Sequence, residues 1–154
     1  SYVGEDGEKH RPVMLHRAIF GSFERFIGVL IEHFAGRFPL CLAPVQVGVL
    51  PIWDDQLESA GALGAQLRAA GIRADVDDRS ETLNYKIREA ETLKVPYMAV
   101  IGGREAEAGT AAVRVRGAGK KQVILPREAL AEQLHAQVQS KTLDLGVEQE
   151  GAEN

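Results

Sequence analysis

The sequence has little of several features that mark specialised classes of protein. Its single cysteine, Cys41, cannot form an internal disulfide and cannot by itself build a zinc site. No apolar run approaches the roughly 20 residues that span a bilayer, and a signal peptide is lacking, so we expect no membrane partner and a reducing, cytoplasmic location. Positive charge is not in excess either. The net charge is −4, which excludes a protein that coats nucleic acid with its whole surface.

The charges that are present are unevenly distributed along the chain. Residues 1–70 carry 6 basic and 8 acidic side chains, residues 71–121 carry 10 and 8, and residues 122–154 carry 2 and 6. Only the middle block has a net positive charge, so we expect a polyanionic partner to bind there. The chain opens on Ser1 without a methionine, and we also expect it to be part of a longer protein.

The first part of the chain is predicted to contain a strand and a helix. Three consecutive apolar residues after a proline predict a short strand over 12–16. Apolar residues then recur at offsets of three and four, which predicts a helix over 22–35 with Ser22 as its N-cap. Two prolines in the stretch that follows are typical of a semi-rigid connector. The predicted boundaries are 1–37 for the first unit and 38–45 for the connector.

Beyond the connector, strands and helices alternate, which predicts an α/β domain over 46–139 with a mixed, mostly parallel sheet flanked by helices. Glycines and capping residues separate the elements, and a hairpin is expected at the edge of the sheet. The acidic tail over 140–154 is expected to be disordered. The predicted strands are 45–52, 72–76, 97–101, 110–116 and 122–125, and the predicted helices are 54–71, 82–93 and 126–139.

A candidate nucleotide site lies where the predicted first strand meets the first helix. Gly21 and Ser22 open the helix, and Arg25 lies in its first turn. A helix start presents unpaired N–H groups and the positive end of the dipole, and an arginine adds a planar cation that binds phosphate or stacks on a base. The alternative is an ordinary helix start, in which the dipole favours Glu24 and Arg25 is solvated.

Two further features admit both a functional and an ordinary interpretation. His16, beside an apolar strand, is either a zinc ligand or a histidine of the core, and a catalytic zinc ion needs at least three protein ligands. Basic residues of the middle block could line an RNA surface, with phosphate contacts and planar groups for unpaired bases, or they could form a solvated face. These residues are Lys86, Arg88, Arg114, Arg116, Lys120 and Lys121.

The segment that contains the N-terminal candidates resembles a known motif. Residues 16–26 read His-Arg-Ala-Ile-Phe-Gly-Ser-Phe-Glu-Arg-Phe, which is similar to motif 3 of the class II aminoacyl-tRNA synthetases, and to the threonyl-tRNA synthetase family in particular. The similarity continues in the same order from residue 2 to residue 136. It includes Pro-Val-Met-Leu-His-Arg at 12–17, Phe-Pro-Leu at 38–40, Leu-Ala-Pro-Val-Gln at 42–46, Tyr-Lys-Ile-Arg-Glu at 85–89 and Val-Pro-Tyr-Met at 95–98.

The resemblance implies a strand–helix remnant of an antiparallel catalytic domain, followed by the anticodon-binding domain of a class II synthetase. Arg25 matches the motif 3 arginine that stacks on the adenine of ATP, which binds with Mg²⁺, and Gly21 and Ser22 lie beside that nucleotide. His16 matches one ligand of the Zn²⁺ ion that binds threonine in this family. The other ligands, a cysteine and a histidine, are expected upstream of the first residue, and Cys41 is not one of them.

In the second domain, the resemblance implies recognition of the anticodon of tRNA(Thr). The expected anticodon-binding residues are Ile52, Ser80, Lys86, Arg88, Glu105 and Arg114. Glu105 and Arg114 match positions that contact the second and third anticodon bases. The family commonly has asparagine at the position of Ser80 and glycine at that of Asn84, so one amide contact to a base is expected to be shorter, water-mediated or absent.

As a whole, the resemblance implies the carboxy-terminal part of an enzyme that activates threonine with ATP and transfers it to tRNA(Thr). The complete enzyme is expected to be a cytoplasmic homodimer. This part alone is expected to be inactive, because most groups that stabilise the adenylate belong to motifs outside it. Two alternatives stay open. One is a stand-alone RNA-binding module without catalysis, and the other is a class II enzyme with the same type of domain, such as the prolyl, glycyl or histidyl synthetase.

Overall fold

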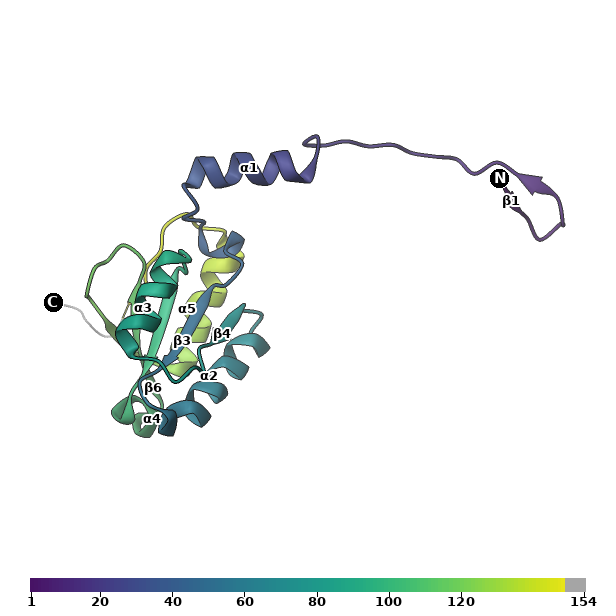
Figure 1. The fold of residues 1–154 in the computed structure, drawn as a ribbon. Coiled ribbons are helices and arrows are strands. Elements are labelled where there is room, and N and C mark those ends of the chain that lie inside the picture. Colours follow the sequence, from purple (N-terminus) through teal and green to yellow (C-terminus); the bar gives the residue numbers. More distant parts are fainter. Residues whose placement is uncertain (149–154) are drawn as a thin grey trace.

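Five strands form the sheet at the centre of the structure, a computed structural model that describes residues 1–148 (Figure 1). They are β3 Val47–Pro51, β4 Ala74–Val76, β5 Tyr97–Ile101, β6 Thr110–Val115 and β7 Val123–Pro126, in the spatial order β4-β3-β5-β6-β7. β3 pairs in parallel with β4 and β5, whereas β6 runs antiparallel to β5 and β7. Because β6 alone opposes the common direction, the predicted mixed, mostly parallel sheet is confirmed.

Helices cover both faces of this sheet. They are α2 Leu57–Ala69, α3 Leu83–Thr92 and α5 Arg127–Ser140. Successive side chains of a strand point to opposite faces, so Val47 and Val49 of β3 pack into the core formed with α2 and α5, whereas Leu50 packs into a second core beneath α3. Both β3 and β5 are buried along their whole length, which explains their continuous apolar runs.

Three short elements that the sequence analysis did not predict lie between the longer ones. The helix α4 Gly103–Ala108 follows β5, and the 3₁₀ turns η1 Leu40–Leu42 and η2 Asp54–Gln56 precede β3 and α2. α4 has 6 residues, none of them buried. It therefore lacks the apolar stripe by which a helix is recognised in a sequence.

The helix α1 Phe23–Phe34 lies outside the α/β domain, between that domain and the extended N-terminal arm (Figure 1). It begins where it was predicted, and Ser22 caps it. None of its residues is buried, and Phe23 is 84% exposed. The apolar face of α1 is therefore largely open within the part of the chain that the structure describes. Among residues 1–148, no helix combines the length and the hydropathy needed to cross a bilayer.

The strand predicted over 12–16 is absent from the structure. These residues are exposed and belong to neither a helix nor a strand. A strand needs a neighbour that completes its backbone hydrogen bonds, and no other strand pairs with this segment within residues 1–148. The pairing in this region is instead a hairpin of β1 Tyr2–Val3 and β2 Lys9–His10, in whose turn Asp6 accepts a hydrogen bond from the Glu8 N–H at 3.0 Å.

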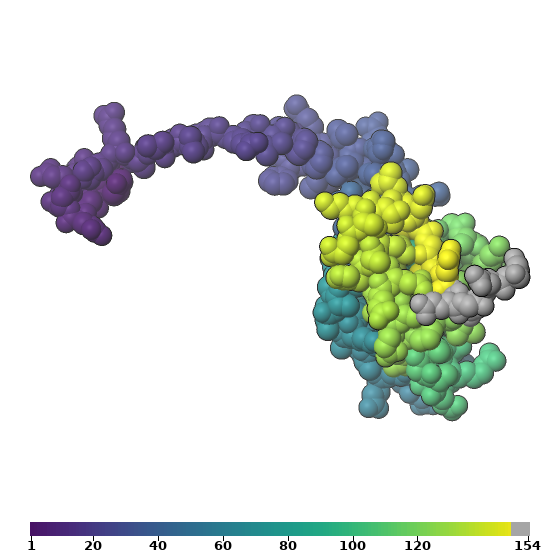
Figure 2. All heavy atoms as spheres, turned by 180° about the vertical axis from the view of Figure 1, so that it is seen from behind, coloured from purple at the N-terminus to yellow at the C-terminus, as the bar shows by residue number. Residues whose placement is uncertain are grey.

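Residues 141–148 pack against the α/β domain, although disorder was predicted over 140–154. Val147 is buried in the core beneath α2 and α5, and the Gly146 N–H donates to the Tyr97 hydroxyl at 2.8 Å. That hydroxyl donates to Oε1 of Gln137 at 2.7 Å, and its burial raises the pKa of Tyr97. Figure 2 shows this segment, in yellow, lying against the body of the molecule. The rest of the predicted tail, 149–154, lies outside the described residues.

Two arginines hold the connector over 38–45 against the domain. Arg73 donates from Nη2 to the carbonyl oxygen of Ala43 at 2.8 Å. Arg116 donates from Nη2 to the carbonyl oxygen of Phe38 at 2.9 Å, and partial burial lowers its pKa. Hydrogen bonds from charged donors are stronger than those between neutral groups, so these contacts fix the path of the chain between α1 and β3.

Candidate nucleic-acid interface

Three loops converge at the edge of the sheet where the parallel strands end. β3 leads into residues 52–56, β4 into residues 77–82, and β5 into residues 102–105. Parallel strands place their carboxyl ends at one edge, so segments that are far apart in the sequence meet there, and ligands of α/β sheets usually bind outside such an edge. We call these three segments the carboxyl edge. Ile52, Ser80 and Glu105, which were predicted from the sequence, all lie on it.

Ile52 and Glu105 are brought together around Gly102. Oε2 of Glu105 accepts a hydrogen bond from the Gly102 N–H at 3.1 Å, and the Ile52 N–H donates to the Ile101 carbonyl oxygen at 3.0 Å. A Cβ atom at Gly102 would lie 2.7 Å from Oε2 of Glu105 and 3.0 Å from Cδ1 of Ile52. Glycine therefore lets both side chains approach the same piece of backbone.

Ser80 lies across a cavity from Ile52. The cavity has a volume of about 340 Å³, with Ile52 and Trp53 on one side and the residues that lead into α3 on the other. Thr82 caps α3 by accepting a hydrogen bond from the Tyr85 N–H at 3.4 Å. This cap fixes the end of the loop that carries Ser80, and the exposed serine lines the cavity.

Lys86 reaches the same cavity from α3 but is not a surface cation. It is 4% exposed, and Nζ donates to the carbonyl oxygens of Asp77 at 3.0 Å and of Pro51 at 3.3 Å. The sequence analysis offered this lysine either as an RNA-binding residue or as part of a solvated face; its burial excludes the solvated face, and the expected contact with the anticodon stays a prediction. The ends of β3 and β4 leave backbone carbonyl groups without strand partners, and the ammonium group satisfies them. Lys86 therefore ties the two strand ends together.

Arg88 lies on a different face of α3 from Lys86, because two residues turn an α-helix by about 200°. It is exposed, and its side chain makes no hydrogen bond or ion pair with any described residue. It does not line the cavity. The guanidinium group is thus available to a phosphate outside the cavity.

Arg114 lies at the other end of the sheet, where β6 pairs it with Met98 near the start of β5. Nη2 donates to the Gly119 carbonyl oxygen at 3.1 Å and lies 3.8 Å from Oε1 of Glu91 on α3. Nε of Arg114 is buried and has no hydrogen-bond partner within residues 1–148. The structure therefore does not bring Arg114 into the cavity at the carboxyl edge.

We call residues 114–121, which include the turn between β6 and β7, the hairpin end. Its cations differ in their surroundings. Arg116 points inward and donates to the carbonyl oxygens of Phe38 and Lys94, whereas Lys120 and Lys121 are exposed in the turn. Only part of the positive charge that the sequence places here is therefore free to meet a polyanion.

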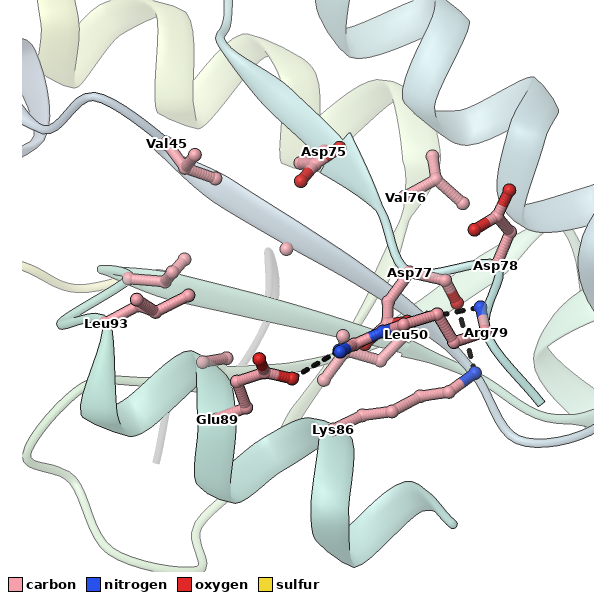
Figure 3. A pocket seen from close by; sticks show the side chains of 13 residues that line it. Val45, Leu50, Asp75, Val76, Asp77, Asp78, Arg79, Lys86, Glu89 and Leu93 are labelled. Atoms are coloured by element: carbon pink, nitrogen blue, oxygen red, sulfur yellow. Dashed lines mark hydrogen bonds and ion pairs between the residues drawn. The ribbon is translucent and has the colours of Figure 1, made fainter. Parts of the chain in front are cut away.

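A second cavity of about 390 Å³ lies between β4 and α3 (Figure 3). Arg79 donates to both carboxylate oxygens of Asp77, at 2.9 and 2.7 Å, and pairs with Glu89. Hydrogen bonds from Arg79 hold the pKa of Asp77 below its ordinary value. Since Asp75 and Asp78 also line this cavity, it is acidic overall and does not favour a polyanion. Nothing in the sequence indicated that residues 77, 79 and 89 would meet.

The sequence analysis also missed Trp53, which lies on the carboxyl edge beside Ile52. Its side chain is 72% exposed and lines the first cavity. The available signal was its position, because the single tryptophan of the chain follows the end of a buried strand. An exposed aromatic residue at such a point is a candidate for contact with a ligand.

The predicted nucleotide-binding residues lie at the start of α1, away from the carboxyl edge in Figure 1. Gly21 has a φ of +75°, which other residues rarely adopt, and Oγ of Ser22 accepts a hydrogen bond from the Arg25 N–H at 3.3 Å. Arg25, which carries the guanidinium group, is exposed. His16 is exposed as well, and within residues 1–148 no three His, Cys, Asp or Glu side chains lie close enough together to hold a metal ion. The described residues therefore offer a zinc ion one histidine and not a complete site.

Comparison with known proteins identifies the α/β domain. Residues 46–137 match the family described as the anticodon binding domain. Relatives include the threonine–tRNA ligases of Novosphingobium aromaticivorans, 61% identical over 131 residues, and of Desulforamulus reducens, 55% identical over 143 residues. These matches cover 85% and 93% of this chain but 20% and 22% of the relatives. The chain thus spans about a fifth of the length of the curated relatives it matches.

Two solved structures are similar to the fold. The RNA-binding domain of threonyl-tRNA synthetase from Cryptosporidium parvum Iowa II has a TM-score of 0.72 at 36% identity, over 79% of this chain and 30% of that one. Prolyl-tRNA synthetase from Cryptosporidium parvum has a TM-score of 0.58 at 27% identity, over 67% of this chain and 23% of that one. Since the family match covers more than half of its residues, the chain belongs to the anticodon-binding-domain family.

Proposed function

We propose that this chain is the anticodon-binding part of a threonine–tRNA ligase, the enzyme that activates threonine with ATP and transfers it to tRNA(Thr). The observation that carries the proposal is the convergence of Ile52, Ser80 and Glu105 on the carboxyl edge, where Ile52 and Ser80 line a cavity and Glu105 lies beside Ile52 at Gly102. The names and identities of the relatives support it, and the similarity to the threonyl enzyme exceeds that to the prolyl enzyme in both identity and TM-score.

The three converging residues offer different contacts to an unpaired base. The Ser80 hydroxyl both donates and accepts hydrogen bonds, the Glu105 carboxylate accepts them from amino groups, and Ile52 offers an apolar surface. One oxygen of Glu105 is already held by the Gly102 N–H, which fixes the orientation of the carboxylate. A wrong base leaves such polar groups without partners, and the resulting loss of free energy is the source of discrimination.

Ser80 replaces the asparagine that is common in the threonyl-tRNA synthetase family, and its side chain is shorter. We propose that a water molecule bridges the serine hydroxyl to the base, since bridged contacts retain most of the enthalpy of a direct hydrogen bond. Asn84, in the first turn of α3, stands where the family has glycine and is exposed.

Exposed cations contribute the part of the affinity that does not depend on the base sequence. Arg88 on α3 and the lysines of the hairpin end lie outside the cavity, and Arg114 lies between them near the end of α3. Contacts of such groups with phosphates position the RNA and release counterions, so this part of the affinity falls as the salt concentration rises.

In the whole enzyme, we propose that Gly21, Ser22 and Arg25 bind ATP, which is accompanied by Mg²⁺, and that His16 supplies one of the zinc ligands. The whole enzyme acts as a homodimer in the cytoplasm. The largely exposed apolar face of α1 supports a place within a larger catalytic domain and weighs against a stand-alone RNA-binding module. We expect no exchange of ATP with pyrophosphate by residues 1–154 alone, because one exposed arginine does not build a site for the adenylate.

The experiment compares binding of this chain to a threonine-accepting tRNA and to the same tRNA with its second and third anticodon bases changed. Each titration is made at two salt concentrations. We expect the changes to weaken binding by about tenfold or more, because each unpaired polar group costs about 1–3 kcal/mol. Equal and steeply salt-dependent binding of both RNAs would instead indicate a generic basic surface and contradict the proposal.

A further inference from the structure

Trp53 presents most of its indole ring to solvent at the mouth of the cavity. It is 72% exposed, and within residues 1–148 the ring stacks on no other ring and the indole Nε1–H donates no hydrogen bond. Tryptophan has a large apolar surface and a polar N–H, and it is enriched where a partner covers both. The open indole is therefore a feature that the packing of the domain itself does not explain.

Hydrogen bonds hold the backbone segment that carries this exposed ring. The backbone N–H of Trp53 donates to Oε1 of Gln56 at 3.1 Å, and the backbone N–H of Gln56 donates back to the Trp53 carbonyl oxygen at 3.1 Å. The preceding Ile52 is tied to β5 through the Ile101 carbonyl oxygen at 3.0 Å. Because the backbone around Trp53 is hydrogen-bonded both within its turn and to β5, a partner that stacks on the indole has little backbone left to order.

The charges around the cavity favour an uncharged ring over a phosphate. Asp54 and Glu81 line it together with Lys86, whose ammonium group already donates to two carbonyl oxygens. A phosphate inside would meet two carboxylates and no free cation. The N-terminal end of α3, whose dipole is positive, also faces the cavity through Thr82 and disfavours a cationic guest. A heterocyclic base carries no net charge and offers a flat face.

We infer that Trp53 is the stacking platform for one unpaired base of the bound RNA, with the edge of that base turned towards Ser80. This inference rests on the proposed function and adds a residue to it. Stacking on an aromatic side chain is independent of base identity, so Trp53 contributes affinity, while the polar groups opposite contribute selectivity.

The test uses the only tryptophan of the chain as its own reporter. The intrinsic fluorescence of the 154-residue chain is titrated with the anticodon stem-loop of a threonine-accepting tRNA, and affinities of variants are measured separately by anisotropy of the labelled stem-loop. We expect the RNA to quench the fluorescence of Trp53. Trp53→Ala should weaken binding by about tenfold, whereas Trp53→Phe, which keeps an aromatic face, should weaken it less than threefold.

The control is Leu143→Ala, which removes a similarly exposed apolar side chain that lines no part of the cavity and should leave the affinity unchanged. Circular dichroism checks that each variant folds. If the wild-type chain binds the stem-loop without quenching, and Trp53→Ala binds equally well, the inference is overturned and the proposed function stands. If the wild-type chain does not bind the stem-loop at all, the proposed function fails and the inference fails with it. Quenching by an arginine-rich peptide but not by RNA would assign the indole to a protein partner and would overturn the inference.

Discussion

The carboxyl edge and the hairpin end of the sheet are built from different kinds of side chain. At the carboxyl edge, Ile52 and Ser80 line a cavity, Glu105 lies next to Gly102 beside Ile52, and Lys86 is buried. The hairpin end, residues 114–121, gathers cations and lines neither of the two cavities described above. Local charge in the sequence pointed to the whole middle block, residues 71–121, which contributes to both ends of the sheet, whereas the residues that share a cavity lie at the carboxyl edge.

The difference teaches that a count of positive residues does not locate a site for unpaired bases. Lys86 and Arg116 are both basic, but each donates to two backbone carbonyl oxygens and stabilises the fold. The side chains that are not used to stabilise the fold suggest two separate roles in RNA binding. We propose that the carboxyl edge distinguishes bases by hydrogen bonds and that the exposed cations supply salt-dependent affinity.

The largest expected effect separates two basic residues of α3. Lys86→Met should lower the free energy of unfolding by about 3 kcal/mol, because it leaves the carbonyl oxygens of Asp77 and Pro51 buried without a donor. Arg88→Met, two residues away on the exposed face, should change it by less than about 0.5 kcal/mol. Urea denaturation of both variants measures the difference. Equal losses would remove the distinction between structural and free cations.

The elements of the α/β domain were predictable because each carries a local signal. Apolar stripes mark α2, α3 and α5, the Thr82 cap marks the start of α3, and continuous apolar runs mark β3 and β5. Errors occurred where partners decide the structure. The segment over 12–16 has the composition of a strand but no neighbouring strand, and an acidic composition concealed that Val147 enters the core.

The candidate site was predictable only in part, for a related reason. Ile52, Ser80 and Glu105 follow three strands, so a parallel sheet brings them to one edge. The burial of Lys86 could not be predicted, because its acceptors are backbone carbonyl oxygens at the ends of two strands that are remote in the sequence. Trp53 was missed because exposure is a property of the folded chain.

A smaller effect tests the hairpin end. Arg114→Ala should weaken binding of the cognate stem-loop and of one with changed anticodon bases by the same factor of about five, and should reduce the slope of log K against log salt by about 0.7. The reason is that Arg114 lies outside the cavity, so we expect it to contact the RNA backbone and not a base held in the cavity. Salt-dependent titrations of both RNAs measure this. A loss confined to the cognate RNA would indicate a base contact at the hairpin end, which would contradict the proposed difference between the two ends of the sheet.

The smallest effect concerns the loop that follows β4 and carries Ser80. Hydrogen bonds from Arg79 lower the pKa of Asp77 in the folded state, so the ionised carboxylate contributes stability above its unfolded pKa of about 3.9, and this contribution is lost as the pH falls through the lower folded value. Asp77→Asn should therefore cost less than about 1 kcal/mol at pH 7, and the difference from the wild type should shrink below pH 4. Denaturation at several pH values measures it, with the exposed Asp78→Asn as the control. A cost of Asp77→Asn that did not change with pH would contradict the assignment.

The most direct test of the central claim is a double-mutant cycle between Glu105 and the second and third anticodon bases. Glutamine at position 105 keeps an oxygen for the Gly102 N–H but loses the carboxylate charge. We predict that Glu105→Gln reduces the affinity ratio between cognate and changed stem-loops by about tenfold, because charge-assisted hydrogen bonds are the strong ones, while Lys121→Gln leaves the ratio unchanged. If Glu105→Gln leaves the ratio intact, or Lys121→Gln reduces it as much, the carboxyl edge does not read the anticodon.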